Sequence, residues 1–448
     1  GLGSDALWKS VMGQTPINMP VIFSNGRIPA AGTSERTNPW VIATQTGYYE
    51  EWQNVIQTNA TLDQKLDFIT KGLKFTGRFG FDTYNNNYRN HKQWPEQWQA
   101  ERQRDSNGEI VFKKVAEKQL MFHESSASGN RRQFLEAILQ YDRRFGDHSV
   151  GGTLKYTQDE YVNTQSTAGY DWLPNRHMGL AGRVTYGWKY RYMVDFNFGY
   201  NGSENFAPKK RFGFFPSAAI GYMISNEAFW EPISHIVSVL KFKGSYGIIG
   251  NDQIGGNRRF AFNSEMADVN GYTFGTTGGN PISGIGTGYP GNPYVSWEEA
   301  KKMNIGVELE LYNSLKLNVD YFHERRSGIF IERGAVPSVV GVNVNPYLNL
   351  GEMENKGVDA SLEYYKTINK DWNISVRGNF TYNRNKKLYD DQPSANYPYK
   401  DVIGKPWNQQ FGYIALGYFR TESEIQNSPK QIGNPRVGDL KYKDINGD

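Results

Sequence analysis

The sequence contains a pair of carboxylates, Glu308 and Glu310, of the kind that glycosidases use for general acid–base chemistry. Residues two apart on a strand share one face, and these two groups would stand about 6–7 Å apart. That spacing alone is compatible with acid–base chemistry, but nothing else in the sequence predicts a pocket around the pair. We therefore interpret both glutamates as positions on a charged strand face and expect no catalytic residues in this chain.

Metal-binding potential is confined to one segment. The chain has no Cys, and its six His are scattered without metal-ligand spacing. Residues 444–448 (DINGD) resemble the start of a calcium loop, in which carboxylate and amide oxygens at alternate positions coordinate a hard cation. A structural Ca²⁺ held by Asp444, Asn446 and Asp448 is one hypothesis, and a tight Asx-rich turn is the other. We expect no other cofactor.

Aromatic residues in long polar segments are the candidates for ligand binding. Flat rings stack on the apolar C–H faces of sugars and give ligand pockets much of their contact area. We predict a substrate-binding role for Trp94, Trp98, Tyr170, Trp172, Tyr289, Tyr294 and Trp297. The alternative is that these rings pack the loops together, sit at a membrane interface, or press on a partner protein.

Composition excludes two broad classes of protein. No stretch of the 448 residues approaches the ~18 consecutive apolar residues of a membrane-spanning helix, and the mean hydropathy is −0.66. The 50 basic and 46 acidic residues are well mixed, without the clustered basic face that nucleic-acid binding needs. Aromatic residues make up 15% of the chain and there are 48 glycines, which favours strands, turns and aromatic girdles.

Apolar and polar residues alternate with period two in many segments, as in 73–82 and 192–200, and this pattern predicts strands. We predict twelve strands that pair into six hairpins, at 56–69, 73–85, 131–145, 149–161, 178–187, 190–202, 212–223, 237–248, 301–312, 315–329, 355–366 and 372–385. Five hairpin tips are tight. The sixth, at 225–234, has room for a short helical turn.

The connections between hairpins are long, polar and rich in Gly, Pro and aromatic residues: 86–130, 249–300, 330–354 and 386–448. A soluble sandwich would distribute loop lengths between both ends, whereas an outer-membrane barrel has short turns at one end and long extracellular loops at the other. We therefore expect an all-β fold, a large antiparallel transmembrane barrel. Its charged strand face would line a wet or plugged lumen, and its apolar face would meet lipid.

Several long segments carry a resemblance to a known family. Residues 190–227, YRYMVDFNFGYNGSENFAPKKRFGFFPSAAIGYMISNE, closely resemble the mid-barrel signature of the SusC/RagA family of TonB-dependent outer-membrane transporters. Further segments match in the expected order, at 63–82, 240–252, 297–311, 321–330, 347–364 and 438–448. The resemblance extends over nearly the whole chain and implies that 1–448 is part of one receptor β-barrel domain with long extracellular loops.

This resemblance implies much that the residues alone do not. Family barrels have about twenty-two strands, so about twelve of them would lie here. The signal peptide, plug domain, TonB-contacting segment, first strands and C-terminal strands would lie outside this chain. The resemblance also implies a SusD-like surface lipoprotein over the long loops as a partner, and TonB as the source of force. The imported substrate would be an oligosaccharide, or an oligopeptide as in some members.

Two other functions stay open at this stage. One is a surface-binding or adhesin barrel that holds a glycan or host protein without transport, and the other is a passive porin. A plug domain and a TonB-contacting segment would distinguish an importer from both, because neither alternative needs them. The identity of the substrate cannot be predicted from the residues.

Overall fold

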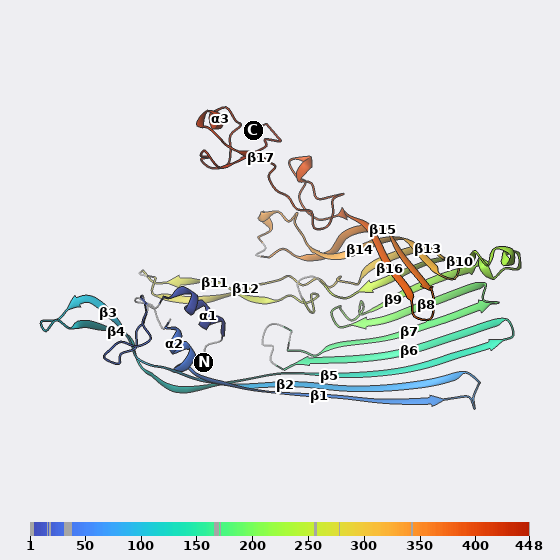
Figure 1. Ribbon diagram of the computed structural model, residues 1–448, viewed down its shortest axis with the longest axis horizontal. Coiled ribbons are helices and arrows are strands. Elements are labelled where there is room, and N and C mark those ends of the chain that lie inside the picture. The colour runs from blue at the N-terminus through green and yellow to red at the C-terminus, as the bar shows by residue number, and fades with distance from the viewer. Residues whose placement is uncertain are drawn as a thin grey trace. The chain divides into compact units, whose positions relative to one another are not determined.

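The computed structural model describes residues 4–15, 17, 19–30, 38–164, 170, 172–254, 258–276, 278–341 and 344–447. Among them, twelve strands form one antiparallel sheet whose neighbours follow chain order, apart from two inserted hairpins (Figure 1). These strands are β1 (Gly47–Lys65), β2 (Leu73–Trp94), β5 (Gln119–Phe145), β6 (His148–Asn163), β7 (Asn175–Trp188), β8 (Tyr192–Ser203), β9 (Phe212–Met223), β10 (Val237–Asn251), β13 (Glu298–Leu311), β14 (Leu315–Glu332), β15 (Tyr347–Thr367) and β16 (Asn373–Tyr389). The predicted number of strands in this sheet is confirmed.

Several strands are longer than the alternation of apolar residues predicts. The ladder between β2 and β5 continues from the apolar part through Asn85↔Gly129 and Tyr88↔Ser126 to His91↔His123. The strand bounds therefore differ from the prediction, because β2 ends at Trp94 and β5 begins at Gln119. Backbone hydrogen bonds need no apolar side chains, so a ladder can continue through a polar segment that carries no hydrophobic signal.

Three small two-stranded sheets lie in the segments that were expected to be long connections. They are β3–β4 (Gln97–Arg104, Ile110–Ala116), β11–β12 (Met266–Phe274, Asn280–Thr287) and β17–β18 (Ala415–Tyr418, Leu440–Tyr442). Figure 1 shows β2 and β5 leading into the β3–β4 hairpin. The helices are short: α1 (Ser4–Gly13), α2 (Pro39–Thr44) and α3 (Glu422–Gln426). In the described part of the chain, no helix is long and apolar enough to cross a membrane.

The opposite ends of the long strands are joined by tight turns. Lys189 and Tyr190, and likewise Tyr312 and Asn313, have positive φ angles between 49° and 54°. Such consecutive left-handed residues give the backbone twist that a short hairpin needs. The longer connection between β9 and β10 contains two 3₁₀ turns, η1 (Ile224–Asn226) and η2 (Ala228–Ile233), which confirms the helical turn expected there.

The chain divides into two compact units. The first comprises 1–141, 153–181 and 201–204, and the second comprises 142–152, 182–200 and 205–448. In the second unit a small core forms from Phe206, Ile254, Val295 and Phe330. Many apolar strand residues lie outside any core and are exposed, including Val184, Phe214, Ile220, Val376 and Phe380. Rows of exposed apolar side chains on one sheet face are what a lipid-facing wall presents.

Candidate functional site

A network of charged side chains lies on the polar face of β10, β13 and β14. The Lys241 ammonium is 3.3 Å from the Glu308 carboxylate, and Lys243 is 3.3 Å from Glu308 and 3.1 Å from Asp320. Glu310 has its own cation, Lys316, at 4.0 Å. Because each glutamate of the Glu308/Glu310 pair faces lysine, the arrangement is that of a charged wall rather than of a general acid and base.

The polar face of this second unit is also hollowed. A recess of about 530 Å³ is lined by residues of β5 to β10, among them Arg183, Asp195, Lys241 and Lys243. The Arg183 guanidinium forms an ion pair with Asp195. A surface with this much charge holds water and polar solutes well, and it would be costly to place against lipid.

The first unit has a comparable set of ionised groups. Glu136 on β5 is buried, with only 3% of its side chain exposed, and pairs with Arg78 of β2 at 2.9 Å and with Lys155 of β6. Arg132 donates to Asp159 at 2.6 Å. The charged pairs thus cross between neighbouring strands on one face, as on the second unit.

Next to Arg132 lies a recess of about 480 Å³ that the sequence did not reveal as a site. Its lining combines charge with two phenol rings and comes from four strands: Val55, Gln57, Asp82, Thr83, Tyr84, Asn130, Arg132, Asp159 and Tyr161. The sequence does carry a signal for this recess, because its lining residues include three pairs that are two positions apart on a strand: 82/84, 130/132 and 159/161. Only the strand register brings the pairs together, and register cannot be read from one sequence.

The four predicted aromatic residues of the first unit differ in exposure. Trp94 ends β2 and is half-buried, as are Trp98 and Tyr170, whereas Trp172 is 58% exposed. The Trp98 ring lies 4.4 Å from the Arg27 guanidinium, and its Nε1 donates to the Glu96 carboxylate at 3.2 Å. Trp98 thus helps to hold the β3–β4 hairpin, and Trp172 is the ring most open to a ligand.

The three predicted residues of the second unit divide in the same way. Trp297 packs against Phe206 and Phe215, each with ring centroids 5.2 Å apart, and its Nε1 donates to the Arg211 carbonyl. Tyr289 contacts the Arg258 guanidinium. Tyr294 is 79% exposed. Trp297 therefore stabilises the loop core, and Tyr294 is free to meet a ligand.

The predicted calcium segment forms a turn. The Asp444 carboxylate accepts the backbone N–H groups of Asn446 at 3.1 Å and Gly447 at 2.7 Å, which is the geometry of an Asx turn. Asp448 lies outside the described residues. Within the described residues, no group of three or more His, Asp or Glu has the arrangement of a metal site. The calcium hypothesis stays a prediction.

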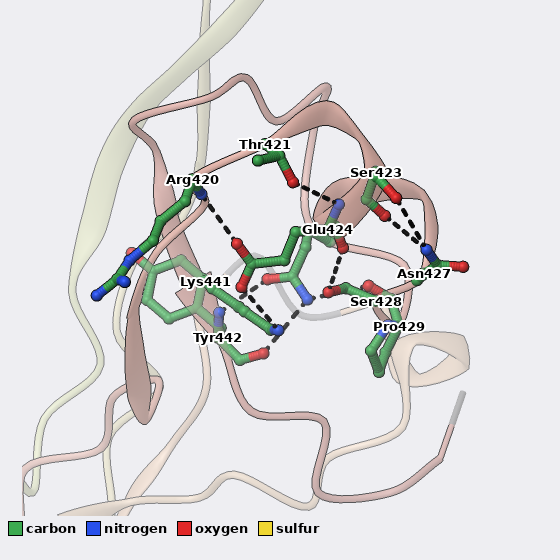
Figure 2. A network of polar contacts seen from close by, with 10 residues as sticks. Arg420, Thr421, Ser423, Glu424, Asn427, Ser428, Pro429, Lys441 and Tyr442 are labelled. Atoms are coloured by element: carbon green, nitrogen blue, oxygen red, sulfur yellow. Dashed lines mark hydrogen bonds and ion pairs between the residues drawn. The ribbon is translucent and has the colours of Figure 1, made fainter.

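A polar network organises residues 420–442 (Figure 2). Glu424 accepts the Arg420 backbone N–H at 2.9 Å, and Lys441 donates to it at 3.4 Å. The Arg420 hydrogen bond, with the Lys441 charge beside it, holds the pKa of Glu424 below its ordinary value of 4.5. Thr421 caps α3 by accepting the Glu424 N–H at 3.1 Å. The network ties α3 to β18 and so fixes this end of the described chain.

Comparisons with known proteins agree with this architecture. The sequence model of one family, described as "TonB dependent receptor-like, beta-barrel", matches residues 9–448. TonB-dependent receptor P3 of Formosa agariphila is 26% identical over 350 residues, which cover 70% of this chain and 34% of that protein. TonB-dependent receptor SusC of Bacteroides thetaiotaomicron is 27% identical over 315 residues, which cover 66% and 30%. The chain therefore spans about a third of the length of these relatives.

Solved structures show the same fold. The RagAB peptide importer in its "closed-closed" state matches with a TM-score of 0.63 at 21% identity, over 90% of this chain and 44% of that chain. This likeness bears on the fold alone. It supports the expected all-β architecture, and no plug-like domain is evident among the described residues.

Proposed function

Because the chain belongs to the TonB-dependent receptor-like β-barrel family of the Gram-negative outer membrane, we propose that the complete protein actively imports an oligomeric nutrient. The ligand would pass into the periplasm without chemical change, when force transmitted by TonB displaces a plug. Segments outside this chain would supply the plug and the contact with TonB.

The observation that supports this proposal best is the division of the sheet into two chemically different faces. Exposed apolar side chains such as Phe214 and Phe380 lie on one face, and ion pairs such as Lys243–Asp320 lie on the other. A barrel wall with lipid on one side and a wet or plugged passage on the other needs this division. The lysines that face Glu308 and Glu310 further argue against catalysis by this pair.

An oligosaccharide is the substrate class that we propose, and an oligopeptide is the alternative. Trp172 and Tyr294 are the exposed rings among the predicted binding residues, and stacking on aromatic rings is how proteins commonly hold sugar C–H faces. Tyr84 and Tyr161, which line the recess beside Arg132, offer further ring surface to a ligand inside the barrel.

We further propose that a SusD-like lipoprotein covers the loop ends of the strands. The small hairpins β3–β4 and β11–β12 extend the loops beyond the sheet and provide surface for such a partner. The runner-up functions are an adhesin barrel and a passive porin, for which neither a lipoprotein nor a plug is required.

Native mass spectrometry of the complete protein, gently extracted from its own membrane, tests the proposal. Co-purification of a SusD-like lipoprotein with a trapped glycan would support import and identify the substrate class, and a trapped peptide would select the alternative substrate. A barrel that is recovered alone and empty, with a mass too small for a plug, would contradict import. Thermal melting with and without a calcium chelator, on the same sample, tests the calcium hypothesis.

A further inference from the structure

A band of half-buried and exposed apolar rows crosses β13, β14, β15 and β16. Directly opposite residues of an antiparallel pair share a face, so the register defines each row. From the turn end upward the rows are Leu311–Leu315–Tyr364–Val376, Leu309–Leu317–Leu362–Gly378, Val307–Val319–Ala360–Phe380 and Ile305–Tyr321–Val358–Tyr382. Tyr321 and Tyr382 in the last row supply aromatic rings, as expected for the edge of a membrane band.

The height of this band matches that of a membrane interior. Rows recur every two residues, about 6.8 Å along a strand, or about 5 Å in height for a strand tilted by about 40°. Four such intervals lead from the first apolar row to the first row beyond the band, so that row lies about 20 Å above the first, close to the height of about 25 Å of the apolar band on outer-membrane barrels. The next row toward the loops must lie at the level of the lipid headgroups.

Charge begins abruptly at that level. The fifth row is Met303–His323–Lys356–Arg384, and the sixth is Lys301–Arg325–Glu354–Lys386. They lie on the face that bears the apolar rows, not on the face that bears the Lys243–Asp320 network, because their residue numbers continue the same alternation. A headgroup-facing patch of six basic residues therefore sits directly above an apolar wall.

Not all of these cations are neutralised by the protein. Arg325 pairs with Glu352 at 2.8 Å, and Glu354 holds both His323 at 2.8 Å and Lys386 at 2.7 Å. Lys301, Lys356 and Arg384 are exposed, and none of them forms an ion pair with another residue that the structure describes. Lys356 and Arg384 are also direct cross-strand neighbours, so their charges can converge on one ligand.

We infer that this patch binds the phosphate groups of an outer-leaflet lipid headgroup. Lys and Arg are the side chains that bind phosphate oxygens most strongly. The apolar rows below would contact the acyl chains of the same molecule, so one lipid can bind to both the basic patch and the apolar rows. The long connections at this end of the strands place it in the outer leaflet. The inference concerns the lipid-facing wall and does not depend on what the protein imports.

The test is native mass spectrometry of the complete protein in detergent, titrated with bisphosphorylated lipid A. The K356Q/R384Q variant removes two exposed cations of the patch that form no ion pair with a described residue. The matched control, K366Q/K370Q, removes two exposed lysines from the turn end of the same strands, where neither forms an ion pair with a described residue. A basic side chain near a lipid surface contributes about tenfold or less to affinity, so we expect roughly a 30-fold weaker binding for K356Q/R384Q and little change for the control.

Two further arms make the outcomes decisive. The charge-conserving K356R/R384K variant, which should fold and melt like the wild type, is expected to retain binding. The wild type is expected to bind a lipid A with one phosphate removed more weakly than the bisphosphorylated form. K356Q/R384Q is expected to bind the two forms with equal affinity. The inference is overturned if the two glutamine variants lose affinity equally, if neither loses affinity, or if inorganic phosphate alone binds as tightly as the lipid.

Discussion

The Lys243 ammonium reaches the Asp320 carboxylate, 3.1 Å away, across the intervening strand at Gly306. Gly306 is the register partner of both residues, on β10 and on β14. A Cβ atom added at Gly306 would lie 2.1 Å from Asp320 Oδ1 and 2.5 Å from Lys243 Cε. Because Gly306 has no side chain, it leaves open the space in which the two charged groups meet.

Substitution of Gly306 by Ala should separate this ion pair. Both partners must move, and overpacking of this kind typically lowers the free energy of unfolding by about 1–3 kcal/mol. The ion pair itself is partly exposed and contributes only about 1 kcal/mol or less. Thermal unfolding of the complete protein in detergent is the measurement. Gly378→Ala is the matched control, because a Cβ there would have no atom within 4 Å; equal melting of the two variants would contradict the role of Gly306.

Glu136 is the most buried carboxylate of the strand network, and its loss should be costly. Glu136→Gln removes the charge shared by Arg78 and Lys155 and leaves two cations facing one another. We expect the free energy of unfolding to fall by about 1–3 kcal/mol, since both cations are still about half exposed and can reach water. Chemical denaturation measures the loss. Glu101→Gln on the exposed part of β3 serves as control, and adding Arg78→Met to Glu136→Gln should recover part of the stability.

How far the sequence predicts this fold depends on which signal each element carries. Strand interiors such as β13 and β14 follow from strict alternation, and the antiparallel sheet of twelve strands is confirmed. The extension of β2 to Trp94 could not be predicted, because residues 85–90 are polar on both faces. Trp297 shows the same limit for sites. Its position in a polar connection predicts ligand binding, which stays a prediction, whereas its packing against Phe206 is visible only in the fold.

Low pH should loosen the segment that Glu424 organises. The pKa of Glu424 is lowered in the folded state by the Arg420 hydrogen bond, so its contribution to stability is fully present above its ordinary value of about 4.5. The contribution is lost as the pH falls through the lower, folded-state value. Hydrogen exchange of 415–447, corrected for the intrinsic rate at each pH, should show protection falling below pH 4.5. Glu424→Gln should be less protected at neutral pH and should lose this pH dependence; an unchanged profile would contradict the assignment.

The exposed ring of Trp172 and the packed ring of Trp297 should respond differently to the same substitution. Trp172→Ala is expected to weaken substrate binding by roughly tenfold, the magnitude of one aromatic stacking contact, with little effect on melting. Trp297→Ala removes a ring that packs against Phe206 and Phe215, so it should lower the free energy of unfolding by about 3 kcal/mol. Substrate titration and thermal unfolding of both variants separate the two roles. The binding hypothesis for the first unit fails if the combined replacement of Trp94, Trp98, Tyr170 and Trp172 by Ala leaves the affinity of a folded protein unchanged.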